Sequence, residues 1–216
     1  MTRRGRFISV DGPSGVGKST TIQALHDELL DRSINVYRTV EPTTTDLGRF
    51  ISGHFAEIRG YALACLVAAD RYEHVQREIE PRLCAGDTVI TDRYLASTLV
   101  MQRLDGVPLD YLLALNAPVL RPDLSVILTA DPGLIADRIA ARGPHNRFHR
   151  DPTAPGREVL YYRETAQILA ADNVKVLVVD TGSCTPSEVA TAIADTIPDS
   201  SVASTVPSQS TTSQGP

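Results

Sequence analysis

Short apolar runs alternate along this chain with longer segments whose apolar residues recur every three or four positions. The short runs are typical of strands buried in a sheet, whereas the longer spacing predicts amphipathic helices. The predicted strands cover residues 7–10, 35–40, 88–91, 124–129 and 174–179. Because strands and helices alternate throughout, the pattern predicts an α/β fold whose parallel sheet is flanked by helices on both faces.

The predicted helices are marked by apolar spacing and by residues that favour helix ends. The first carries Ile22, Leu25, Leu29 and Leu30 on one face and is closed by Ser33. The others cover residues 47–58, 61–83, 95–103, 108–117, 132–142 and 157–171, and a last one opens at the capping box of Thr185 and Glu188. Pro81 is expected to bend or shorten the end of the long helix at 61–83.

Composition adds limits on the class of protein. The 216 residues fit one domain, residues 1–199, and a Ser-, Thr- and Pro-rich tail, residues 200–216, that we expect to be disordered. A net charge of −5 argues against nucleic acid as a partner. Three cysteines without metal-ligand spacing are typical of a cytoplasmic protein. The basic N-terminus lacks the apolar stretch of a signal peptide, and no run approaches the ~20 apolar residues that span a membrane.

A phosphate-binding motif follows the first predicted strand. Gly12 is separated by four residues from Gly17-Lys18-Ser19, the pattern of a P-loop, and a predicted helix begins there. Backbone N–H groups of such a loop converge on phosphate oxygens at the positive end of the helix dipole. We therefore expect ATP phosphates to be bound by Gly12, Pro13, Ser14, Gly15, Val16, Gly17, Lys18, Ser19 and Thr20, with Ser19 also on Mg²⁺. The alternative is a glycine-rich turn with a chance Lys-Ser pair.

Charged residues at two other places fit a second phosphate site. Asp92 and Arg93 end the third predicted strand, and the carboxyl ends of parallel strands are where open α/β sheets place ligand chemistry. Arg93 and Arg71 suit an acceptor monophosphate, because a guanidinium binds phosphate bidentately. Asp92 fits a role in orienting Mg²⁺ or its waters. The alternatives are an exposed helix charge for Arg71 and a turn or helix cap for Asp92.

Residues 143–156 are rich in Arg, Pro and Gly, and they predict a short lid. Arg138, Arg142, Arg147 and Arg150 would bring positive charge onto a transferring phosphoryl group, and a closing lid excludes water. A solvated basic loop is the alternative. The sequence lacks the Asn-Lys-x-Asp guanine reader of GTPase switches, and its length leaves no room for the added domains of large ATPases. A kinase for a small molecule fits best.

Taken together, these motifs resemble the thymidylate kinase family of P-loop nucleoside monophosphate kinases over roughly residues 5–197. The matching pieces are Gly12 to Thr20, Glu41-Pro-Thr43, Ala69-Asp-Arg71, Asp92-Arg-Tyr-x-x-Ser97, Gln102, Arg121-Pro-Asp123, Asp131-Pro132 and Asn146-Arg-Phe148. The resemblance implies transfer of the γ-phosphoryl group of ATP to thymidine monophosphate, with Mg²⁺, by a homodimer.

The resemblance also implies roles for single residues. Arg93 would bind the acceptor phosphate, and Arg71 the carbonyl edge of the pyrimidine, although a second phosphate arginine remains open. The candidate catalytic residues are Lys18, Asp92, Arg93 and Arg147, with Ser19 and Asp92 on the metal and Arg138 and Arg142 on ATP. The acceptor would be surrounded by Glu41, Val67, Arg71, Arg93, Ser97, Thr98, Met101 and Gln102.

Several positions depart from the family pattern. Val67 stands where many members have an aromatic residue that stacks on thymine, and Met101 where a Tyr usually lies under the deoxyribose. Ser14 replaces a frequent P-loop acid, Val40 a frequent Arg, and His149 a Glu of the lid. Val67 and Met101 favour a second hypothesis, a kinase for a modified or different pyrimidine monophosphate. A third hypothesis is a nucleotide-binding regulator without catalysis, against which the lid and Asp92-Arg93 argue.

Overall fold

The computed structural model describes residues 4–143, 151 and 153–197. Arg147, most of the predicted lid and the predicted tail at 200–216 lie outside the described residues, as does the side chain of Arg142. None of the helices in the described part is both long and apolar enough to cross a membrane.

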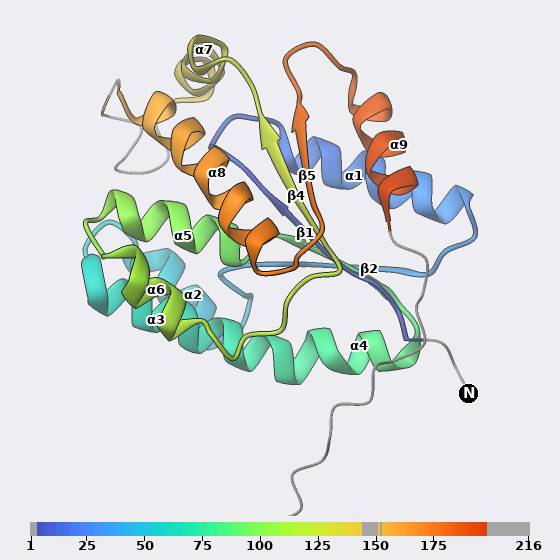
Figure 1. Cartoon of the computed structure of the whole chain (residues 1–216), viewed down its shortest axis with the longest axis horizontal. Coiled ribbons are helices and arrows are strands. Elements are labelled where there is room, and N and C mark those ends of the chain that lie inside the picture. The colour runs from blue at the N-terminus through green and yellow to red at the C-terminus, as the bar shows by residue number, and fades with distance from the viewer. Residues whose placement is uncertain (1–3, 144–150, 152, 198–216) are drawn as a thin grey trace, which may run out of the picture.

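A single five-stranded sheet forms the centre of the molecule (Figure 1). Its strands are β1 (Phe7–Asp11), β2 (Val36–Val40), β3 (Thr88–Asp92), β4 (Leu124–Thr129) and β5 (Val176–Asp180), in the order β2-β3-β1-β4-β5. All neighbouring strands are parallel. This confirms the predicted fold class. Since β1 is central and buried along its whole length, the P-loop that follows it starts from a rigid position.

Helices cover both faces of the sheet. They are α1 (Lys18–Asp31), α2 (Asp46–His54), α3 (Gly60–His74), η1 (Val75–Ile79), α4 (Glu80–Ala85), α5 (Leu95–Leu104), α6 (Leu109–Leu115), α7 (Pro132–Arg142), α8 (Ala154–Ala171) and α9 (Pro186–Thr196). Figure 1 shows α1 and α9 on one face and α3, α4, α5, α6 and α8 on the other.

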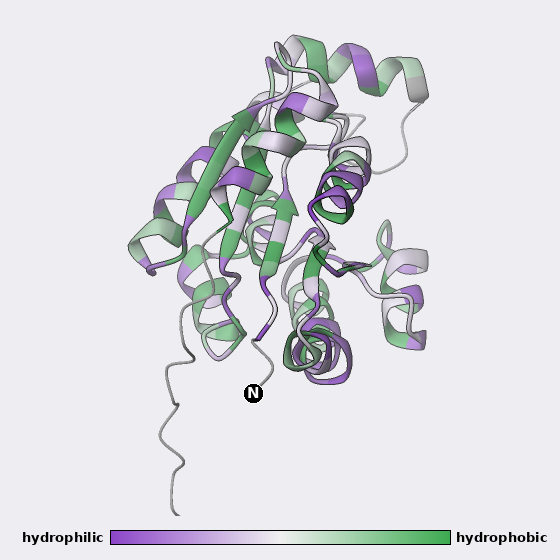
Figure 2. Cartoon of the chain, turned by 90° about the vertical axis from the view of Figure 1, so that its right-hand side faces the viewer, coloured by the Kyte–Doolittle hydropathy of each residue, from purple (hydrophilic) through white to green (hydrophobic). Residues whose placement is uncertain are grey.

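Successive residues of β1 point into two separate hydrophobic clusters, as the period of a strand requires. Phe7 packs with residues of α3, α5 and α8 on one face, while Ile8 and Val10 pack with residues of α1 and α9 on the other. In Figure 2 hydrophobic colour runs along the strands, while purple appears on the outer helices. Burial on both faces explains why the central strands read as nearly continuous apolar runs.

The long predicted helix at 61–83 is in fact three joined segments, and Pro81 does not end it. The backbone passes from α3 through the π-helical segment Val75–Ile79 into α4, which continues to Ala85. The N–H of Glu80 bonds to the carbonyl of Val75, five residues back. A proline lacks an N–H and collides with the carbonyl four residues earlier, and the wider π turn just before Pro81 removes that conflict.

Two other predictions differ from the structure at single residues. Leu30 was placed on the buried face of α1, but its side chain is 49% exposed, whereas Leu25 and Leu29 are buried. Leu30 follows Leu29 by one position, which turns it about 100° away from the core. Helix α8 begins at Ala154, so the last three residues of the predicted lid form its first turn.

Candidate functional site

The P-loop connects β1 to α1 with the backbone that its glycines permit. Gly12 has φ 148° and Gly17 φ 105°, in the region that favours glycine. A Cβ at Gly12 would lie 2.5 Å from the carbonyl oxygen of Leu128 on the neighbouring strand. The predicted strand, glycine loop and helix are therefore all present, and a chance glycine-rich turn does not account for them.

Lys18 is buried at the start of α1, and its ammonium group lies over the loop. Its Nζ donates to the carbonyl oxygens of Gly12 and Pro13, each at 2.8 Å. Burial, and then the nearby charge of Arg93, lower the pKa of Lys18 to about 7, although the carboxylates around it act in the opposite direction. Phosphate oxygens favour the charged form, so nucleotide binding should return the proton to Lys18.

The two predicted magnesium ligands lie together at the edge of the sheet. The Ser19 hydroxyl is close enough to Asp92 to lower the pKa of its carboxyl, and Asp92 pairs in register with Val10 on β1. Burial raises the pKa of Asp92, while the charges of Lys18 and Arg93 lower it. Its Oδ1 is buried and has no hydrogen-bond partner among the described residues. An unpaired carboxylate oxygen beside a hydroxyl fits Mg²⁺, which binds through few protein ligands plus phosphates and water.

Arg93 occupies a strained position after β3. Its φ of 71° lies in the left-handed region, which is unfavourable for a residue with a side chain. Its N–H donates to the carbonyl of Val10 at 3.0 Å, and its own carbonyl accepts from the Thr91 hydroxyl at 2.8 Å. The guanidinium reaches Ser97 with Nη1 at 3.4 Å from the hydroxyl oxygen. Strain of this kind persists where surrounding contacts over-determine the backbone, often at functional sites.

Asp11, which the sequence analysis did not single out, fixes the segment after Arg93. This fully buried carboxylate ends β1, and its Oδ1 accepts from the N–H of Tyr94 and the N–H of Ser97, each at 2.9 Å. It also accepts from the Ser97 hydroxyl at 2.6 Å. Asp11 thus caps the N-terminus of α5 from another strand. No local sequence pattern reveals it, because its partners are more than 80 residues away.

Arg71 lies at the centre of a buried polar network, so the alternative of an exposed helix charge is wrong. Only 1% of it is exposed. Its guanidinium pairs with the Glu41 carboxylate at 2.7 Å and donates to Asn116 Oδ1 and Thr98 Oγ1, also at 2.7 Å. His74 contacts the other Glu41 oxygen at 3.1 Å. The network joins the end of β2 to α3, α5 and α6.

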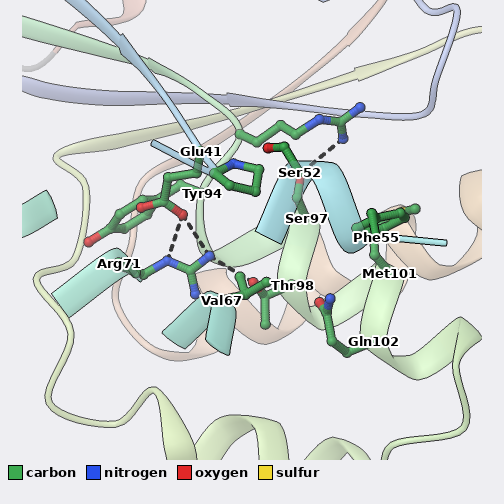
Figure 3. A pocket seen from close by; sticks show the side chains of 12 residues that line it. Glu41, Ser52, Phe55, Val67, Arg71, Tyr94, Ser97, Thr98, Met101 and Gln102 are labelled. Carbon is green, nitrogen blue, oxygen red and sulfur yellow. Dashed lines mark hydrogen bonds and ion pairs between the residues drawn. The ribbon is translucent and has the colours of Figure 1, made fainter. Parts of the chain in front are cut away.

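These residues open onto one cavity of about 270 Å³ (Figure 3). All eight predicted acceptor residues line it: Glu41, Val67, Arg71, Arg93, Ser97, Thr98, Met101 and Gln102. Four further residues line it without having been predicted: Pro42, Ser52, Phe55 and Tyr94. The side-chain amide oxygen of Gln102, Oε1, is buried and without a partner among the described residues, so it is available to a ligand. The structure thus brings together residues spread over 62 positions of sequence.

A second cavity, of about 230 Å³, lies beside the P-loop. It is lined by Gly15, Val16, Gly17, Thr20, Thr21, Arg138, Thr181, Cys184, Pro186 and Val189. Arg138 comes from α7 and donates to the Val16 carbonyl at 3.4 Å. A cavity that borders the P-loop is a suitable place for the remainder of a donor nucleotide.

Helix α8 also contributes to the site, which the sequence analysis missed. Glu158 is 3% exposed, and its Oε2 accepts from the N–H of Ser14 at 3.2 Å. Burial raises the pKa of Glu158, although the Ser14 hydrogen bond and the charges of Arg93 and Lys18 oppose that change. One turn further along, the Tyr162 hydroxyl lies 3.1 Å from the Ser97 hydroxyl. The i, i+4 spacing places Glu158 and Tyr162 on one face of α8. The sequence does not indicate which part of the protein that face contacts.

The features together define a nucleoside monophosphate kinase: a P-loop, a pocket lined by two arginines, and a helix that follows an Arg-rich segment. Comparison with known proteins supports this class. A sequence model described as thymidylate kinase matches residues 10–193. Probable thymidylate kinases of Caldivirga maquilingensis and Pyrococcus horikoshii are 40% and 37% identical to this chain. The alignments cover 67% and 68% of this chain, and 73% and 76% of those relatives.

The chain therefore belongs to the thymidylate kinase family. It is an enzyme, an ATP-dependent nucleoside monophosphate kinase.

Proposed function

We propose that this enzyme transfers the γ-phosphoryl group of ATP to thymidine 5′-monophosphate and so gives the diphosphate needed for nucleotide biosynthesis. One observation carries the proposal: the acceptor pocket, with all eight expected residues on its wall, contains Arg93, whose charge acts on the P-loop residue Lys18. The family and the names of its relatives support the same reaction.

On the donor side, the P-loop amides from Gly12 to Thr20 would surround the β- and γ-phosphates of ATP. Lys18 would leave the loop carbonyls and neutralise the phosphate charge. Ser19 and Asp92 would hold Mg²⁺, which neutralises further charge on the phosphates when it is bound. Arg138 would lie beside the donor nucleotide, with Arg142 on the same helix.

On the acceptor side, Arg71 and Arg93 differ in whether a carboxylate already neutralises their charge, and this difference assigns their roles. Arg71 is already neutralised by Glu41 at 2.7 Å, so it suits a neutral acceptor atom such as a pyrimidine carbonyl. The described partners of Arg93 include no carboxylate within ion-pairing distance, and its guanidinium contacts the neutral Ser97 hydroxyl, which leaves its charge for phosphate. We therefore assign Arg71 to the base and Arg93 to the monophosphate, with Thr98 and Gln102 beside the base and sugar.

In the reaction, a phosphate oxygen of the acceptor attacks the γ-phosphorus, and the bond to the bridging oxygen of ADP breaks. Such transfers depend mainly on alignment and on neutralising charge at the transferring group. Lys18 and Arg93 would supply that charge from opposite sides. Arg147 of the predicted lid would add to that charge.

We propose a homodimer that forms through α3 and α6. Tyr61 and Leu113 are 52% and 37% exposed there, and the Tyr61 ring packs edge-on against Tyr111 at 4.8 Å between centroids. Apolar side chains gathered on one exposed face are typical of an interface. Leu113→Asp should give monomers by light scattering, whereas the exposed Leu30→Asp on α1 should not. Dimers that persist in Leu113→Asp would place the interface elsewhere. We expect the protein in the cytoplasm, and its three exposed cysteines form no disulfide.

A coupled assay of ADP release with a panel of nucleoside monophosphates tests the function. Thymidine monophosphate should give the highest kcat/KM. A higher value for another pyrimidine would favour the second hypothesis, to which Val67 and Met101 point. No ADP release with any monophosphate, from a protein that binds ATP, would make it a regulator.

A further inference from the structure

The acceptor pocket carries the Glu41–Arg71 ion pair on one side, which we call its polar side. Figure 3 shows Glu41 and Arg71 together on one side, and Phe55 and Met101 together on the other. Phe55 caps the C-terminus of α2, and its half-buried ring packs against the cluster that includes Val67. It therefore lines the pocket from a different element than the α3 position where the sequence analysis looked for an aromatic ring.

We propose that Phe55 is the residue that stacks on the acceptor base in this enzyme. This inference rests on the proposed function and names the side chain that contacts the face of the base. The polar side of the pocket can hold the edge of a flat base through Arg71 and Thr98. The face of that base then needs an apolar partner, and Phe55 is the only residue with an unsubstituted phenyl ring on the described wall.

A ring at the end of α2 instead of on α3 changes which substituents of the base the pocket can accept. Val67 is small, so the wall on α3 leaves space, while the ring is supplied by a helix that joins the fold largely through Ile51, Leu63 and Val67. The base is then held by a side chain at the end of α2. We expect stacking to be retained for any pyrimidine, with tolerance toward substituents that point at Val67.

The test compares binding of thymidine 5′-monophosphate and of 2-deoxyribose 5-phosphate, which has no base, by calorimetry. Phe55→Ala should weaken binding of the nucleotide by about 5- to 150-fold, the range for loss of one aromatic–base stack. It should leave binding of the sugar phosphate unchanged. Phe50→Ala is the matched control, since Phe50 lies on the same helix, is 45% exposed and does not line the pocket.

A second variant keeps the proposal falsifiable if the first one is destabilised. Phe55→Ala with Val67→Phe returns a ring to the pocket from α3 and should recover a large part of the lost affinity. An unchanged nucleotide affinity in Phe55→Ala, or equal losses for nucleotide and sugar phosphate, would overturn the inference alone. A wild-type protein that binds no pyrimidine monophosphate would overturn the proposed function and this inference with it.

Discussion

Replacing Asp11 by Ala tests how the acceptor end of the site is held together. Asp11 is fully buried at the end of β1, and one of its oxygens accepts from two backbone amides, those of Tyr94 and Ser97. Those amides belong to the turn that contains Arg93 and to the first turn of α5. Alanine removes the acceptor and leaves both amides inside the protein.

The magnitude follows from those two groups. A buried amide without a partner costs about 1–3 kcal/mol, so two cost about 2–6 kcal/mol. The Ser97 hydroxyl adds little, because it can turn to the Tyr162 hydroxyl at 3.1 Å. Release of Arg93 from its left-handed conformation offsets about 1–2 kcal/mol of this loss in the free energy of unfolding. We expect a net loss of about 3 kcal/mol, or roughly 6–12 °C in Tm for a domain of this size. Asp11→Asn keeps an acceptor oxygen and should lose about 1 kcal/mol.

Urea unfolding followed by circular dichroism measures these losses. The chain contains no Trp, so helix content is the better signal. KM for the monophosphate should rise in Asp11→Ala more than KM for ATP, since the hydrogen bonds of Asp11 go to Tyr94 and Ser97 and, among the described residues, none goes to the P-loop. If both variants unfold within about 0.5 kcal/mol of the wild type, the carboxylate does not hold this turn, and the reasoning fails.

Three further predictions concern charge. At pH 8, ATP binding should take up a proton, because Lys18 with a pKa of about 7 is mostly neutral in the free protein. The affinity for ATP should therefore fall as pH rises above 7. Calorimetry in two buffers measures the proton uptake, which should vanish in Lys18→Ala together with turnover. Arg93→Ala should raise KM for the monophosphate at least tenfold, about 1.5–3 kcal/mol, but not weaken nucleoside binding; equal losses would make Arg93 structural. Glu158→Ala should weaken binding of a non-hydrolysable ATP analogue, because the Ser14 amide loses its acceptor, whereas Glu164→Gln on the same helix should not; equal affinities would remove Glu158 from the site.

The fold and the acceptor pocket could be predicted from sequence because their signals are local. The P-loop lies within nine residues, and the central strands are short, largely apolar runs. Asp92 and Arg93 were found because they follow a strand directly, and parallel strands place such residues at one edge. The motif pieces then led to all eight predicted residues of the cavity wall.

The missed residues have partners that are distant in sequence. The hydrogen-bond partners of Asp11, Tyr94 and Ser97, lie 83 and 86 positions further along the chain. Glu158 accepts from Ser14, which is 144 positions away. Phe55 was passed over because a helix end before a turn gives no indication of which cavity it faces. The same limit explains why Arg71 was left open between base and phosphate: its neutralisation by Glu41 appears only when β2 and α3 are packed together.

The π-helical segment Val75–Ile79 fixes the rotational phase between two halves of a long helix. Above it, Arg71 and His74 face the polar network, and below it Leu83 faces the core. Each residue of an α-helix turns the chain by about 100°. Deleting one residue here would restore regular α geometry, and helix content would hardly change. The wider π turn has taken up that extra residue, so the two halves would keep their phase. A residue added in regular α geometry would instead rotate one half against the other by about 100°, so that either Arg71 leaves the pocket or Leu83 leaves the core. This segment should therefore tolerate substitutions and a single deletion far better than insertions.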